Sequence, residues 1–147
     1  MTGFASQIEF DAGRTLTPSR SEEGFATRGV RVLLRLEGLA AFVTVLTLYW
    51  HLGFSWRAFA VLFLAPDLSM LAYLAGPRGG AVGYNVAHTY ALALALTLVG
   101  FAGGVPEVAA GGFILIAHIG FDRALGYGLK YATGFGDTHL GRIGRAA

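Results

Sequence analysis

A histidine and an aspartate, His118 and Asp122, stand four residues apart in the segment AHIGFDRALGYGLKY, near the end of an otherwise apolar run. On a helix this spacing directs both side chains to the same face, about one turn apart. Ionisable side chains within an apolar span are costly unless they are paired, metal-bound or hydrated, so they are functional candidates. The pair indicates a site for metal binding or proton transfer.

The composition is that of an integral membrane protein. Of the 147 residues, 54% are hydrophobic and only 14% are charged, and the mean hydropathy is +0.57. Soluble domains usually carry about a quarter charged residues. The net charge of +2 and the scattered arginines argue against nucleic-acid binding, so membrane lipid is the expected partner. The absence of cysteine excludes disulfides and thiolate metal sites.

Four apolar segments predict the architecture. Each is close to the roughly 20 residues that cross a bilayer core. The short connections between them make sequential helices antiparallel neighbours. We therefore expect an all-α, integral membrane four-helix up-down bundle over residues 30–127. The predicted spans are 30–52, 56–74, 81–101 and 105–127.

The flanking segments differ from the spans. Residues 1–29 are polar and are expected to form a flexible cytoplasmic tail, and residues 128–147 are glycine-rich and are expected to form an irregular cytoplasmic segment. Basic residues collect on one side of a four-span chain, which predicts that both termini are cytoplasmic and that the protein is multi-pass in the cell membrane. These basic residues are Arg14, Arg20, Arg28, Arg31, Arg78, Arg123, Lys130, Arg142 and Arg145.

Each predicted span carries one ionisable residue at a similar depth. Glu37, Asp67, His88 and His118 all fall about 10 Å below the cytoplasmic boundary at 1.5 Å per residue. Asp122 follows one turn nearer that boundary. This convergence predicts one polar pocket that opens to the cytoplasmic side.

Further polar residues extend this pocket. Tyr84 and Asn85 accompany His88 on adjoining turns, and Pro66 should loosen the second helix beside Asp67. Asp137 and His139 lie in the C-terminal segment, where they either fold back over the pocket mouth or only cap a turn. The accessory candidates for the site are therefore Tyr84, Asn85, Asp137 and His139.

The leading hypothesis is a divalent metal held by His88, His118, Asp67 and Asp122. Imidazole and carboxylate are the usual ligands of zinc, iron or manganese, and bundle cores commonly hold such sites. The metal could activate water or oxygen, with Glu37, Asp67 or Asp122 as the general base of an enzyme. Haem between the two histidines is a smaller part of this hypothesis.

Two other hypotheses stay open. The same carboxylates and histidines could isomerise or cyclise a lipid-like, apolar substrate without metal. Alternatively, they form a structural polar network in a non-catalytic carrier or interaction module. A carrier needs polar groups at both membrane faces, whereas the outer halves of these spans are nearly uncharged. The sequence allows a homo-oligomer and does not name the substrate.

Several motifs together resemble a family of small prokaryotic membrane proteins, the domain of unknown function 4260. The resemblance covers about Val30 to Gly144. It implies a small multi-span membrane protein and supplies no activity or site residues. The motifs are LLRLEG, APDLSMLAYLAGPRGG, YNVAHTY, AHIGFDRALGYGLKY and GFGDTHLGRIG.

Overall fold

The computed structural model describes residues 27–143, and in it four helical spans are long and apolar enough to cross a membrane. The prediction of an all-α, multi-pass membrane protein is confirmed. The predicted tail, residues 1–29, lies outside the described residues except for Thr27, which precedes α1, and Arg28 and Gly29, which are the first residues of α1. The spans are α1 (Arg28–His51), α2 with η1 (Trp56–Leu62 and Ala65–Ala75), α3 with α4 (Pro77–Ala87 and Tyr90–Ala102) and α5 (Pro106–Leu125).

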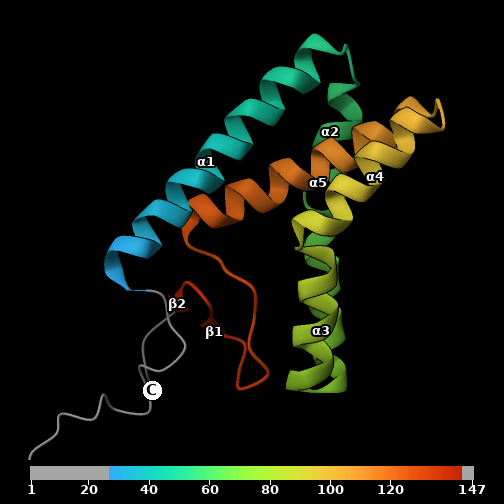
Figure 1. Ribbon diagram of the computed structural model, residues 1–147. Helices are drawn as coiled ribbons and strands as arrows, with labels where there is room; N and C mark the ends of the chain where they lie inside the picture. Colours follow the sequence, from blue (N-terminus) through green and yellow to red (C-terminus); the bar gives the residue numbers. More distant parts are fainter. Residues whose placement is uncertain (1–26, 144–147) are drawn as a thin grey trace, which may run out of the picture.

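Helix α5 is the centre of the fold. It packs along α1 on one side and along α4 on the other (Figure 1). Every residue from Gly112 to Gly120 is buried. Such a helix, apolar all round and covered by neighbours, forms the core of a small bundle.

Glycines allow the helices to approach α5 closely. A Cβ on Gly120 would stand 2.8 Å from the carbonyl oxygen of Gly38 in α1, so the α1–α5 crossing tolerates no side chain there. At the α4–α5 contact, a Cβ on Gly112 would stand 2.5 Å from the backbone nitrogen of Thr97. Small residues at crossings are the usual basis of helix association in membranes.

The second and third spans are both broken. The second span changes from the α-helix α2 to the 3₁₀ helix η1 beside Pro66, which has no N–H to continue the ladder. The third span breaks after His88, and the Thr89 hydroxyl caps α4 by accepting a hydrogen bond from the Ala91 N–H. These breaks turn η1 and α3 into a hairpin that projects away from the α4–α5 packing (Figure 1).

The connection between the second and third spans is shorter than predicted. We expected a loop over residues 75–80, but α3 begins at Pro77 because proline suits the first position of a helix. Only Gly76 remains between η1 and α3, with a φ of 93° that favours glycine.

The C-terminal segment folds back over the bundle instead of forming only an irregular loop. Strands β1 (Asp137–Thr138) and β2 (Gly141–Arg142) pair as a small antiparallel hairpin. Asn85 fixes the segment to α3. Its Nδ2 donates to the Lys130 carbonyl at 2.9 Å, and the Lys130 N–H donates to its Oδ1 at 2.7 Å. The segment is thereby held beside the C-terminal part of α3.

Candidate metal site

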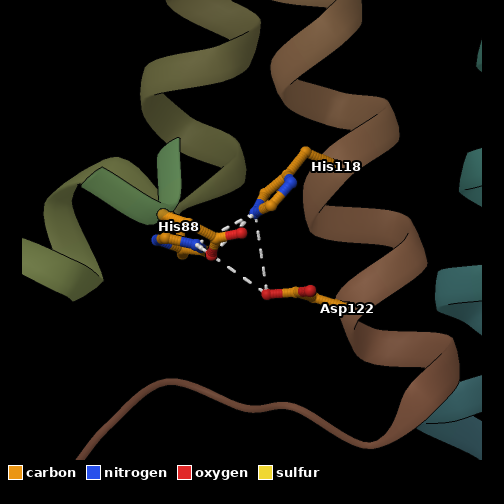
Figure 2. A group of neighbouring side chains, drawn as sticks. His88, His118 and Asp122 are labelled. Carbon is orange, nitrogen blue, oxygen red and sulfur yellow. Dashed lines mark hydrogen bonds and ion pairs between the residues drawn. The ribbon is translucent and has the colours of Figure 1, made fainter. Parts of the chain in front are cut away.

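Two histidines and two aspartates from three helical elements meet at one point. Asp67 belongs to η1, His88 follows the last residue of α3, and His118 and Asp122 lie on α5. Each offers one ligand atom, and these four atoms lie within 4.8 Å of one another. Figure 2 shows the imidazoles of His88 and His118 directed toward each other and the Asp122 carboxylate directed toward both. The structure thus brings together the four residues that the sequence suggested as metal ligands.

The separations within this group match those around one metal ion. The Nε2 atoms of His88 and His118 are 3.1 Å apart. Oδ1 of Asp67 lies 3.5 and 3.6 Å from these two nitrogens, and Oδ2 of Asp122 lies 3.8 Å from each. Four ligands at about 2.0 Å from a tetrahedral ion stand about 3.3 Å from one another. The five separations of 3.1–3.8 Å are therefore close to those expected around a divalent cation, and all four ligand atoms lie within 4.8 Å of one another.

A hydrogen bond fixes the tautomer of His88. Its Nδ1 lies 2.9 Å from the Tyr84 carbonyl oxygen, which can only accept, so Nδ1 carries the proton. Nε2 then presents its lone pair to the site, which is the form that binds a metal. The Tyr84 ring also stacks on the imidazole, with centroids 3.7 Å apart. Tyr84 therefore orients His88 through both a hydrogen bond and a ring contact.

His118 is positioned mainly by packing. Its side chain is buried in α5, and the ring of Phe63 meets it edge to face at 5.4 Å. Its Nδ1 has no hydrogen-bond partner among the described residues. The useful atom of this histidine is therefore Nε2, which faces His88 and both carboxylates.

Tyr84 also holds the Asp122 carboxylate, because its hydroxyl donates to Oδ2 at 3.1 Å. Removing a residue that hydrogen-bonds to a metal ligand typically lowers the metal affinity by about 10–100-fold. We expect Tyr84→Phe to weaken zinc binding by about 10-fold, measured by competition with a chromophoric chelator. Tyr127→Phe is the control, since this pocket hydroxyl makes no hydrogen bond to the four-residue group. Equal affinities in the two variants would contradict a positioning role for Tyr84.

The helix breaks explain how Asp67 and His88 reach the site. Asp67 follows Pro66 at the start of η1, and His88 lies where α3 gives way to α4. Discontinuous helices form ligand sites in many membrane proteins because irregular backbone is tolerated where it lines a cavity. The predicted loosening at Pro66 is confirmed, whereas the break at His88 was not predicted.

The span that carries His88 begins earlier than predicted. The third span starts at Pro77 and not at residue 81. His88 therefore lies about 16 Å along its span at 1.5 Å per residue. It still meets His118, because the α3–η1 hairpin is inclined to α5 (Figure 1).

Glu37 does not join the group that the other four residues form. Its side chain is exposed on α1, and the group of potential ligands in the described chain does not include it. The next residue, Gly38, is the one that faces α5. A helix turns by about 100° per residue, so the contact at Gly38 directs Glu37 elsewhere.

Asp137 and His139 lie outside the group as well. Asp137 accepts hydrogen bonds from Arg142 at 2.8 Å and from Thr133 at 2.7 Å, and these bonds hold its pKa below the usual range. The Nδ1 of His139 accepts from the Leu129 N–H at 2.9 Å, and burial lowers the pKa of this histidine. Both residues stabilise the folded-back segment.

The site opens into a cavity of about 470 Å³. Asp67, His118 and Asp122 form part of its wall, and most of the remaining wall is apolar. This volume is in the usual range for small-molecule sites. Asp137 and His139 do not line this cavity, but four other residues that follow α5 do. Those residues are Tyr127, Lys130, Phe135 and Ile143.

Lys130 is the charged residue of the pocket wall that the sequence did not assign to the site. We counted it only among the basic residues that predict orientation, yet it is 5% exposed and lines the cavity. Burial lowers its pKa. One signal was available, because Lys130 is the only lysine in a chain whose other ten strongly basic residues are arginines.

The distance between the two histidines fits a haem iron bound between them poorly. Two histidines that bind one iron from opposite sides place their nitrogens roughly 4 Å apart, twice a typical metal–nitrogen bond. The observed separation is 3.1 Å, and two carboxylates border the same space. The donor set fits a single divalent ion better.

Comparison with known families gives one match. The model of the family described as "Domain of unknown function (DUF4260)" matches residues 31–143. This match includes all four residues of the candidate metal site. Neither the curated proteins nor the solved structures gave a match.

Proposed function

We propose that this chain, which belongs to the DUF4260 family, is a metal-dependent membrane enzyme that acts on a lipid-like substrate. The observation that carries the proposal is the set of four ligand atoms from Asp67, His88, His118 and Asp122 around one cation-sized space. An apolar cavity adjoins this set, and a lipid-like molecule can occupy it beside the metal.

The charges and donors at the site favour a bound cation over a metal-free site. Two carboxylates and two imidazole nitrogens surround the space, and the hydrogen bond to Tyr84 leaves the His88 Nε2 atom as a lone-pair donor. Like charges held this close are unfavourable unless a cation neutralises them. A divalent ion meets this need and gives every one of the four groups a partner.

We assign different roles to the two aspartates. Asp122 is fixed by the Tyr84 hydroxyl and its side chain is 16% exposed, so it suits a permanent ligand together with the two histidines. Asp67 is 33% exposed and lines the cavity beside a helix break, so it suits the general base or an exchangeable ligand. A bound zinc, iron or manganese ion would act as a Lewis acid toward water or substrate.

The proposal places the pocket on the cytoplasmic side of the cell membrane, with both termini cytoplasmic. The support is the distribution of arginines between the ends of the four spans. Arg123 lies in the last turn of α5, and the segment that lines the pocket begins directly after this helix. The pocket therefore lies at the end of α5 that the proposal places on the cytoplasmic side.

Asp67→Asn tests the enzymatic role. Zinc-loaded protein in liposomes of total lipid extract is compared with the variant, and mass spectrometry follows lipids consumed and formed. We expect a product with the wild type that falls by about 10²–10⁴-fold in the variant, the usual contribution of a general base. Zinc content at saturating metal should stay near one equivalent. A product formed equally by both proteins would contradict the role of Asp67.

Glu37→Gln is the matched control for this experiment, because it removes an exposed carboxylate outside the group. It should retain both zinc and product formation. If no lipid changes in the wild type under any metal, the enzymatic proposal fails while the metal site remains to be judged by its own measurement.

A further inference from the structure

We infer that the cavity beside the metal site binds an amphiphile with an anionic head group, and that Lys130 together with the bound metal holds that head group. This inference rests on the proposed metal site and specifies its substrate class. The observations that carry it are the burial of Lys130, the lack of an ion-pair partner for it among the described residues and the apolar lining around it.

Lys130 is a buried cation with few partners. Its Nζ donates to the Phe135 carbonyl at 3.0 Å and lies 4.2 Å from the centroid of the Phe135 ring. No carboxylate of the described chain lies within 4.0 Å of this ammonium group. Buried charges are normally paired, and an ammonium group has three N–H donors. The free donors of Lys130 can therefore serve a ligand in the cavity that it lines.

The charge balance of the pocket favours an anion once the metal is bound. Asp67 and Asp122 carry two negative charges, which a divalent cation neutralises. Lys130 then remains as the uncompensated charge among the described residues that line the cavity. A site with such an excess of positive charge attracts a carboxylate or phosphate.

The rest of the cavity suits a hydrocarbon chain. Phe63, Met70, Phe121, Leu125 and Phe135 line it. Leu125 and Phe135 are also 51% and 53% exposed, so the apolar wall continues to the outside of the molecule. A chain can enter from the bilayer along this wall while its head group reaches Lys130.

The test compares a fatty acid with its uncharged ester. Zinc-loaded protein in phosphatidylcholine nanodiscs is titrated with cis-parinaric acid and with methyl cis-parinarate, and fluorescence gives both affinities. We expect the wild type to bind the acid at least 10-fold more tightly than the ester, because one hydrogen bond between charged groups changes the affinity by about this factor. Lys130→Met should reduce this ratio by about 10-fold with unchanged ester affinity and zinc content.

Arg78→Met is the control, because it removes an exposed cation that does not line the cavity, and it should leave the ratio unchanged. Ester binding in Lys130→Met shows that the variant is folded. An unchanged acid-to-ester ratio in Lys130→Met with full zinc content overturns the inference and leaves the metal site intact.

Two further outcomes are decisive. Displacement of the acid by millimolar acetate would show a bare anion site and overturn the assignment of an amphiphile. Wild-type protein that takes up none of zinc, iron and manganese overturns the inference together with the proposed function, because the carboxylates are then not neutralised.

Discussion

His118→Ala is expected to abolish stoichiometric metal binding. His118 supplies one of the four ligand atoms from a buried position at the centre of α5, and no other histidine or carboxylate of the described chain joins the group. Removing a direct ligand should lower the metal affinity by more than the 10–100-fold that is lost when a hydrogen-bond partner of a ligand is removed. We expect zinc affinity to fall by at least about 10³-fold in titrations against a chromophoric chelator. His88→Ala should behave in the same way.

His51→Ala is the control for this loss. His51 is an exposed histidine at the end of α1 and lies outside the four-residue group. The variant should bind zinc as the wild type does. Wild-type affinity in His118→Ala would mean that any bound zinc sits elsewhere, for example on exposed histidines.

Two adjacent glycines of α5 should respond in opposite ways to the same substitution. A Cβ on Gly112 would stand 2.5 Å from the Thr97 nitrogen and 2.8 Å from the Ala93 carbonyl oxygen in α4. Backbone atoms cannot move aside, so Gly112→Ala must push α4 away from α5. We expect a loss of about 3 kcal/mol of unfolding free energy, at the upper end of the range for overpacking.

The matched control is Gly111→Ala, because a Cβ there meets nothing within 4 Å. Alanine in place of a helical glycine stabilises by about 0.5–1 kcal/mol, so this variant should match or exceed the wild type. Unfolding in sodium dodecyl sulfate, followed by circular dichroism, measures both. Equal stability of the two variants would contradict the close α4–α5 contact.

The helical part of the fold was readable from sequence because its signals are local. Four apolar runs of membrane-spanning length predicted four spans, and the family resemblance agreed with them. The spacing of His118 and Asp122 predicted a shared face, and both carboxylate and imidazole do face the same point. Periodicity within one helix needs no knowledge of the rest of the fold.

The site could be predicted only in part from the sequence. The position of a residue along a helix can be counted, whereas the direction of its side chain depends on which helix face packs against a neighbour. Counting residues placed Glu37 near the level of the others, but its direction depends on which face of α1 meets α5. That face is set by Gly38, and α1 is too apolar on all sides to reveal it. The helix break at His88 has no adjacent proline or glycine to mark it in the sequence.

The role of Lys130 depends on long-range pairing. Asn85 binds the backbone of residue 130, forty-five positions away, and thereby sets the path of the glycine-rich segment. Glycine-rich sequence has weak local preferences, so only the folded structure shows where it runs. The part of the cavity wall that this segment contributes could therefore not be predicted from the sequence.

The central claim is that Asp67, His88, His118 and Asp122 hold one divalent cation. Inductively coupled plasma mass spectrometry tests it most directly, on protein purified without chelator or histidine tag, with His88→Ala and His118→Ala in parallel. We expect close to one equivalent of zinc, iron or manganese in the wild type and almost none in either variant. Metal-free wild-type protein, after incubation with each of these ions, would contradict the claim.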